Sequence, residues 1–141
     1  RIVSDNISKQ RCQKLLTEQH VYHPEGRELL YTDKLESSIM KESSSTYKFK
    51  GSVDVVDGFE ICLFKRKTYK LVTYSDIALS IVDLFETSPD HCYVVREAYD
   101  KQITETGKEI FLMSGVSTKY GLYNGKYGFY TVLNLTVVYK Y

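Results

Sequence analysis

The stretch LYNGKYGFYTVLNLTVVYKY, residues 122–141, decides the fold because it holds the strongest turn signal in the chain. Asn124-Gly125 is the dipeptide preferred in two-residue hairpin turns, whose two central positions both need a positive φ. A turn there pairs Tyr123 with Lys126 and fixes the register of two long antiparallel strands. Apolar residues then meet apolar residues along one face, which predicts a long C-terminal β-hairpin. On that face Leu122, Tyr120, Thr118, Val116, Ser114, Leu112 and Ile110 lie opposite Tyr127, Phe129, Thr131, Leu133, Leu135, Val137 and Tyr139.

The predicted hairpin is long for the size of the chain. Its arms, of about 14 to 16 residues, would extend roughly 50 Å at about 3.3 Å per residue. A compact domain of this length has a diameter of only about 37 Å. The hairpin is therefore expected to overhang the body or to bend. Gly115 and the facing pair Gly121 and Gly128 are natural places for a bend or bulge.

The hairpin tip is rich in aromatic residues, and three uses for it stay open. The tyrosines can pack over the protein's own core, the tip can protrude as an arm that binds another protein, or its rings can stack on nucleobases. An exposed aromatic tip without a partner favours aggregation, which supports the second use. The residues predicted to bind protein are Tyr120, Leu122, Tyr123, Lys126, Tyr127, Phe129 and Tyr130.

A second hairpin is predicted between residues 46 and 67, where polar and apolar residues alternate around Asp57-Gly58. A three-residue loop at 56–58 gives one coherent apolar face, and positive charge then gathers at the open end of this hairpin. Such charge can bind phosphate, although lysines on an exposed edge strand also protect it from pairing with other sheets. The candidate phosphate-binding residues are Lys48, Lys50, Lys65, Arg66 and Lys67.

Helices are expected on both sides of this second hairpin. Residues 4–19, capped by Ser4 or Asp5, carry a thin apolar stripe, and residues 32–42 form a second candidate helix. Residues 75–86, capped by Ser75, show the clearest helical pattern. The residues of this helix that are predicted to face the core are Ile77, Ala78, Ile81, Val82, Leu84 and Phe85. A strand is predicted at 91–99, followed by a polar turn at 100–109.

The composition fits one globular domain. Hydrophobic residues make up 43% and charged residues 26% of the chain, which argues against disorder. The net charge of +1 gives no overall attraction to nucleic acid or to an anionic membrane, so such binding needs a local patch. No apolar run approaches the roughly 18 residues needed to span a bilayer, and residues 1–10 lack the apolar core of a signal peptide. Cys12, Cys62 and Cys92 are widely spaced and odd in number, which favours free thiols and a cytoplasmic or virion location.

No catalytic or cofactor signature occurs in the sequence. His20 and His23 are close in sequence, but no third metal ligand of suitable spacing lies near them, so no metal or cofactor is predicted. Asp54, Glu60 and Lys65 lack the Glu-x-Lys spacing that a metal-dependent nuclease needs to place both side chains on one face. The sequence therefore favours a protein that is not an enzyme, with a small hydrolase that lacks a familiar motif as an alternative.

These elements together predict one α+β domain over residues 1–141, with a helical part at 1–45 and the sheet, a helix and the long hairpin at 46–141. The expected antiparallel sheet consists of two hairpins plus the strand at 91–99, covered on one face by helix 75–86 and the N-terminal helices. In size and element order the chain resembles small ring-forming phage neck and tail-completion proteins, a resemblance of architecture that covers no specific motif.

The expected function is that of a non-enzymatic assembly or adaptor protein. It is expected to bind protein partners, as a homo-oligomer or within a larger assembly, through edge strands and the aromatic hairpin tip. The alternative is a nucleic-acid-binding module that uses the basic residues of the second hairpin. Contact with a membrane is not expected.

Overall fold

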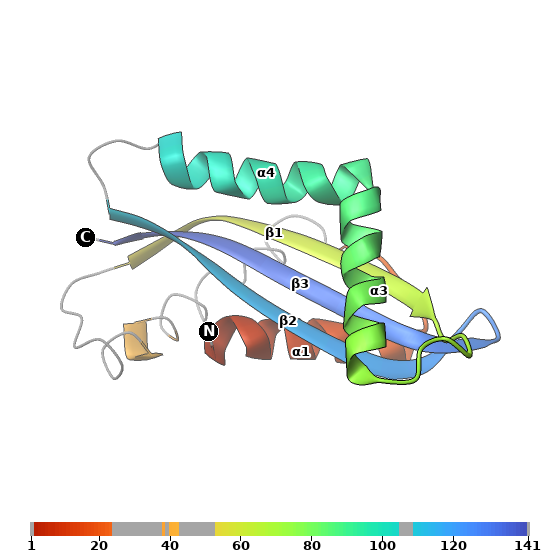
Figure 1. The fold of residues 1–141 in the computed structure, drawn as a ribbon. Coiled ribbons are helices and arrows are strands. Elements are labelled where there is room, and N and C mark those ends of the chain that lie inside the picture. Colours follow the sequence, from red (N-terminus) through yellow and green to blue (C-terminus); the bar gives the residue numbers. More distant parts are fainter. Residues whose placement is uncertain (1, 24–37, 39, 43–52, 105–108, 141) are drawn as a thin grey trace.

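The computed structural model describes residues 2–23, 38, 40–42, 53–104 and 109–140. Among the described residues, the strands form one antiparallel three-stranded sheet in the order β1-β3-β2. The predicted α+β class with an antiparallel sheet is therefore confirmed. Figure 1 shows α1 on one side of the sheet and α4 on the other. The elements, in chain order, are α1 (Ile2–Glu18), β1 (Val53–Arg66), α3 (Tyr74–Thr87), α4 (Pro89–Thr104), β2 (Glu109–Tyr123) and β3 (Lys126–Lys140).

The C-terminal hairpin has the predicted register. β2 and β3 pair without a shift from the turn at 124–125 out to Glu109 opposite Lys140. Asn124 has φ 49° and Gly125 has φ 75°, the two positive values that this turn requires. The strongest local signal in the sequence thus fixes the longest pairing in the fold.

The prediction of a hairpin around 56–58 is wrong. β1 is one strand that pairs antiparallel with β3, ending with Arg66 opposite Gly128. The register shifts once, between Val55 and Asp57, while the turn-forming dipeptide itself pairs regularly, Asp57 with Val137 and Gly58 with Thr136. The apolar strand β3 offers β1 a partner along its whole length, and a strand paired in this way has no need of a local turn.

The prediction of a strand at 91–99 is also wrong, because residues 89–104 form helix α4. The three residues at 93–95 favour a strand locally, since they are aromatic or β-branched. Pro89, however, suits the first position of a helix, where no N–H partner is needed. Good helix formers are frequent from Arg96 onward, and the longer stretch outweighs the short one.

Helix α1 confirms the helix predicted at 4–19 but begins earlier, at Ile2, so neither Ser4 nor Asp5 is its cap. The helix packs against β2 and β3 through small side chains. Ser4 and Ser8 are buried, and the Ser8 hydroxyl donates to the Gly115 carbonyl oxygen at 2.7 Å. A Cβ on Gly115 would overlap the backbone of Ser4. This glycine therefore allows close approach of the helix, and it does not interrupt the strand as predicted.

Both faces of the sheet contribute to the core. On the α1 side, a buried cluster joins the helix to the sheet through Cys12, Leu15, Cys62, Tyr130 and Val132. On the other side, α4 contacts all three strands. Buried residues on that face are Ile61, Leu63, Leu135 and Val137.

Helix α3 confirms the helix predicted at 75–86, with a different cap. The Thr73 side chain accepts a hydrogen bond from the Asp76 N–H at 3.1 Å, and the Asp76 carboxylate accepts one from the Thr73 N–H at 2.8 Å. This reciprocal capping box places the N-cap at Thr73, two residues before the predicted cap Ser75. Of the residues predicted to face the core, Ile81 alone is buried, whereas Ala78 and Val82 are exposed.

Some sequence predictions lie outside the described residues. They include the second hairpin's first strand, with Lys48 and Lys50, and most of the helix at 32–42. Within that helix, the described residues Ser38 and Met40 to Glu42 are helical, and the Glu42 carboxylate accepts from the Val3 N–H at 3.0 Å. The three cysteines are free thiols, as predicted. Across the described ranges, no helix combines the length and apolar character needed to cross a membrane.

Candidate interaction surface at the hairpin tip

The hairpin tip divides its aromatic residues between the interior and the surface. Tyr130 is fully buried, and its hydroxyl donates to the Leu122 carbonyl oxygen at 2.6 Å. Burial raises the pKa of Tyr130, and the neighbouring Tyr123 adds to this effect. Phe64 of β1 lies with its ring centroid 5.0 Å from those of both Tyr123 and Tyr130. Two of the residues predicted to bind protein, Tyr123 and Tyr130, therefore pack within the protein itself.

The opposite face of the tip presents aromatic rings to solvent. Tyr120 is 50% exposed and Tyr127 is 59% exposed. Their rings stack with centroids 5.8 Å apart and an interplanar angle of 15°, and Phe129 lies tilted against Tyr120 at 5.2 Å. Lys126 is also exposed, at the turn itself. This outward subset of the predicted residues is the part that a partner can reach.

The end of β1 brings basic residues to the same place. The Lys67 N–H donates to the Tyr127 carbonyl oxygen at 3.0 Å, which extends the pairing beyond the end of β1. The Lys67 ammonium lies 6.0 Å from the centroid of the Tyr120 ring, within the range of a cation–π contact. The two groups of candidate residues, aromatic and basic, thus meet at the hairpin tip.

Together these residues line an open surface hollow of about 440 Å³, which we call the tip hollow. Among the described residues, three cationic and three tyrosine side chains line it and no acidic side chain does. Such a lining suits a partner that carries negative charge and flat or apolar groups. The lining residues are Arg66, Lys67, Thr68, Tyr69, Tyr120, Gly125, Lys126 and Tyr127.

The described residues among those predicted to bind phosphate do not share one exposed surface. Arg66 and Lys67 are exposed at the tip hollow, while Lys65 is half-buried and lies opposite Phe129 in the sheet. Lys48 and Lys50 lie outside the described residues, and Arg66 lies opposite Gly128 of β3. The sequence contained both groups of residues, but their meeting depends on the β1–β3 register, which the local turn signal obscured.

A second polar cluster, which was not predicted from the sequence, lies on the α1 side of the sheet. Arg11 of α1 makes two charge-assisted hydrogen bonds to Glu60 of β1, at 2.7 Å through Nε and 2.9 Å through Nη2. The same guanidinium donates to the Tyr22 carbonyl oxygen at 2.8 Å. Both ionic side chains are almost wholly buried, at 5% and 0% exposed.

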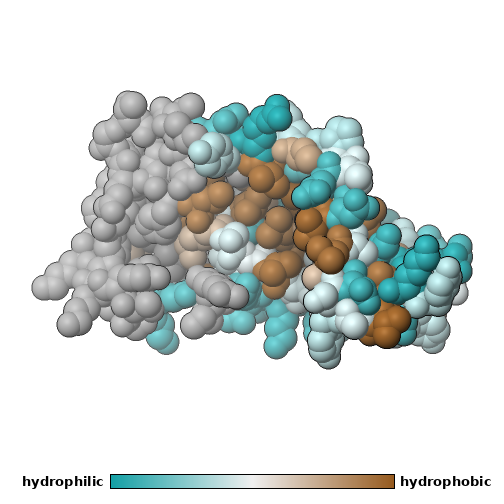
Figure 2. Space-filling view, in the orientation of Figure 1, coloured by the Kyte–Doolittle hydropathy of each residue, from teal (hydrophilic) through white to brown (hydrophobic). Residues whose placement is uncertain are grey.

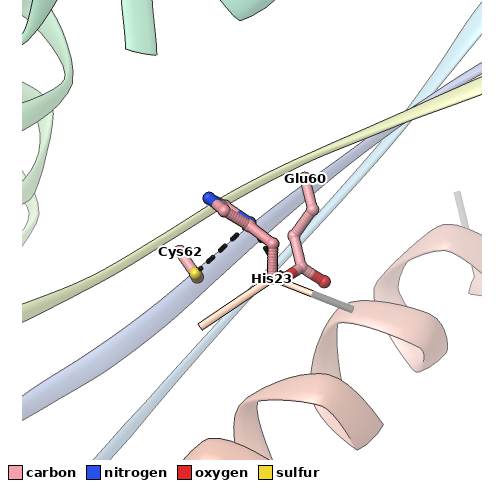
Figure 3. A group of neighbouring side chains, drawn as sticks. All are labelled: His23, Glu60 and Cys62. Carbon is pink, nitrogen blue, oxygen red and sulfur yellow. Dashed lines mark hydrogen bonds and ion pairs between the residues drawn. The ribbon is translucent and has the colours of Figure 1, made fainter. Parts of the chain in front are cut away.

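His23 and Cys62 complete this cluster. His23 Nδ1 lies 3.5 Å from Glu60 Oε1 and 3.6 Å from Cys62 Sγ. Hydrogen bonding to Cys62, followed by that to Glu60, raises the pKa of His23 to about 10. Burial acts to raise the pKa of Glu60, but the hydrogen bonds and charges of His23 and Arg11 outweigh it and hold that pKa below its ordinary value. Figure 3 shows the three side chains pointing toward one another beside α1.

A signal for this cluster exists in the sequence. Glu60 and Cys62 are two positions apart on one strand, so they share a face of the sheet. Arg11 and His23 come from α1 and the residues just after it, and only the docking of that helix brings them to the strand.

Comparisons with protein-family models, with curated proteins and with solved structures found no match to this chain. The functional interpretation therefore rests on the chemistry of its own surfaces.

Proposed function

We propose that the protein is a non-enzymatic assembly subunit that contacts other protein chains through α3, α4, the β2 edge and the exposed face of the hairpin tip. The observation that carries this proposal is the incomplete burial of α3. This helix is rich in apolar residues, yet Ile81 is its only buried side chain. Leu79 is 69% exposed and Val82 is 45% exposed on its outward side.

Apolar exposure continues onto the neighbouring elements. Val95 of α4 is 44% exposed and Val116 of β2 is 55% exposed. Figure 2 shows apolar side chains gathered on this side of the molecule, in the angle between α3 and α4 and over the sheet. Contiguous apolar surface of this kind on a small domain favours a protein interface, because leaving it in water costs free energy that association recovers.

A viral structural role, in a ring of the phage neck or tail-completion kind, is the specific form of this proposal. A ring needs two different surfaces on each subunit, so that one copy contacts the next head to tail. The α3 surface and the hairpin tip are two such surfaces, and they differ in character: the first is apolar and the second is aromatic and basic. Homo-oligomerisation through both is the arrangement that we expect.

The solution mass, measured by light scattering over a range of concentrations, tests the proposal. We expect wild-type protein to associate, and we expect Leu79→Ser combined with Val82→Ser to weaken association by about tenfold or more, a loss of at least about 1.4 kcal/mol. The matched control is Gln10→Ser with Gln13→Ser, two exposed residues of α1 on the other side of the sheet. A wild-type protein that stays monomeric throughout would contradict self-assembly, and an α3 variant that associates as the control does would show that α3 is not a contact surface.

The hairpin tip needs its own variant. Tyr120→Ser with Tyr127→Ser removes the two exposed stacked rings and leaves the buried Tyr130 in place. If the tip contacts a neighbouring subunit, this variant also loses association. If its mass stays that of the wild type while the α3 variant dissociates, the tip is not part of the self-contact.

The tip hollow supports a second candidate function, the binding of single-stranded nucleic acid. Its cations can contact phosphates while its tyrosines stack on bases. Fluorescence anisotropy with a labelled single-stranded oligonucleotide tests this. Phosphate contacts predict affinity that falls steeply with added salt, and Lys67→Ala with Lys126→Ala should reduce the salt dependence by about one unit of slope per lysine. Binding that is absent, or independent of salt, would remove this candidate.

A further inference from the structure

His23, Glu60 and Cys62 bring three different metal-ligating atoms together. His23 Nδ1, one Glu60 carboxylate oxygen and Cys62 Sγ all lie within 4.8 Å of one another. Glu60 and Cys62 share one face of β1, and His23 lies in the segment that follows α1. Figure 3 shows a dashed line joining the Cys62 sulfur to the His23 ring, with Glu60 beside it.

The arrangement does not suit a nucleophilic triad. In a triad, the nucleophile contacts one ring nitrogen of the histidine and the carboxylate contacts the other. Here both Cys62 and Glu60 approach the same nitrogen, Nδ1, at 3.6 and 3.5 Å. These separations are also long for strong hydrogen bonds. The three donor atoms instead form a triangle, like one face of a coordination shell.

Two sides of this triangle match those of a tetrahedral zinc site, and the third, between Cys62 Sγ and the Glu60 carboxylate oxygen, is within 4.8 Å. Zinc binds imidazole nitrogen at about 2.0–2.1 Å, thiolate sulfur at about 2.3 Å and carboxylate oxygen at about 2.0–2.2 Å. Those bond lengths place nitrogen and sulfur about 3.6 Å apart, and nitrogen and oxygen about 3.4 Å apart, at the tetrahedral angle. The observed separations are 3.6 Å and 3.5 Å.

We propose that His23, Glu60 and Cys62 bind one zinc ion or a similar borderline-soft divalent cation. Thiolate, imidazole and carboxylate together are a donor set that selects zinc over magnesium or calcium. His23 is 57% exposed, which gives the ion a path from solvent, while the Glu60 side chain is fully buried. Three protein ligands leave a fourth position for water or another small ligand.

Arg11 has an outer-shell role in this site. Its two hydrogen bonds hold the Glu60 carboxylate in place and its bond to the Tyr22 carbonyl oxygen fixes the residue before His23. Each carboxylate oxygen has two acceptor positions, so the contact with Arg11 leaves Oε1 one position for the ion. Outer-shell partners of this kind orient metal ligands.

Titration with Co²⁺ tests the proposal, because cobalt substitutes for zinc and its bond to thiolate has a near-ultraviolet charge-transfer band. Reduced protein is first freed of metal with a chelator. We expect one equivalent of Co²⁺ to give the band and one equivalent of Zn²⁺ to remove it. Cys62→Ser should abolish the band, and His23→Ala should weaken binding by more than the roughly 10- to 100-fold that loss of an outer-shell partner costs.

Matched variants separate this site from other cysteines and histidines. Cys92→Ser removes an exposed thiol and Cys12→Ser a buried thiol outside the cluster, and His20→Ala removes the histidine that stacks on Tyr22. All three should keep the band. A wild-type protein without a band, or a band that persists in Cys62→Ser or disappears in Cys92→Ser, would overturn the proposal.

Thermal stability gives a second readout that does not depend on colour. Binding to the folded state alone raises Tm in proportion to the logarithm of free ligand. Zn²⁺ should therefore raise the Tm of wild-type protein and leave that of His23→Ala unchanged. His23 is exposed, so this variant should fold, and circular dichroism checks that it does. An equal shift in both proteins would count against the site.

Discussion

At the scale of single residues, the Arg11–Glu60 pair is the interaction whose loss should cost most. Both side chains are buried and joined by two hydrogen bonds. Removing Arg11 leaves the buried Glu60 charge with only the exposed His23 as its ionic partner, so Arg11→Met should lower the free energy of unfolding by up to about 3–5 kcal/mol. Urea denaturation in the presence of a chelator measures this loss without any metal contribution.

Two further variants sharpen that prediction. Arg11→Met combined with Glu60→Leu removes both charges and should recover most of the lost stability, because no buried charge is left unpaired. The exposed Arg96→Met serves as the control and should change stability by no more than about 0.5 kcal/mol. If Arg11→Met is as mild as the control, the pair contributes little to the folded state.

Cys12 provides a pH-dependent prediction at the same scale. Burial raises the pKa of its thiol from 9.0 to about 11, against smaller opposing effects of Lys119 and Ser117. The unfolded chain therefore releases this proton at lower pH than the folded protein does. As a result, folding stability should fall as the pH rises from about 9 to about 11.

Comparison with Cys12→Ala isolates this effect from the titration of lysines and tyrosines. The variant should show a smaller loss of stability over the same pH range. Thiol labelling provides a parallel test: the exposed Cys92 should react first, and Cys12 only when the protein unfolds. Rapid labelling of Cys12 in native protein would show that the packing of α1 does not protect this thiol from the reagent.

At the scale of elements, the close contact between α1 and β2 is the feature most sensitive to one added methyl group. A Cβ at Gly115 would overlap the α1 backbone at Ser4, whereas at Gly121 it would meet only the end of the Leu16 side chain. Gly115→Ala should therefore destabilise by about 1–3 kcal/mol or more, and Gly121→Ala by less, because a side chain can move where a helix cannot. Thermal unfolding of both variants measures the difference, and equal losses would contradict it.

The elements also show what a sequence can and cannot predict. The β2–β3 register follows from one turn dipeptide, so it was predictable residue by residue. The dipeptide Asp57-Gly58 carries a similar local signal, but β1 pairs with a strand far away in sequence, and both residues of the dipeptide take regular partners in it. Residues 93–95 also led to a wrong prediction, because these three strand-forming residues lie within a helix of 16 residues.

In the candidate sites, too, some features were predictable from the local sequence and others depended on contacts between distant parts of the chain. The aromatic residues of the tip and the basic residues after β1 were recognisable separately. Strand alternation separates the two faces of the tip but does not say which one is exposed. Their meeting in the tip hollow needed the β1–β3 register. The cluster around Glu60 needed the position of α1, and no local pattern encodes how Arg11 and His23 dock on a strand that begins 30 residues after His23.

At the scale of the whole molecule, an assembly driven by apolar surface should respond to conditions in a characteristic way. Salts that strengthen apolar burial, such as sulfate, should increase the mass of the assembly, and cooling should weaken it. Calorimetric dilution should give a negative heat-capacity change on association. Dissociation in sulfate would instead indicate that charges, such as those of the tip hollow, hold the subunits together.

The position of β3 has a consequence for how the chain reaches this state. β3 is the middle strand of the sheet, yet it is synthesised after both of its neighbours. On the ribosome, β1 and β2 therefore emerge before β3, the strand with which both of them pair among the described residues. Their exposed backbones are prone to aggregate during this interval. A nascent chain of this design gains from a chaperone that shields β1 and β2 until β3 has been synthesised.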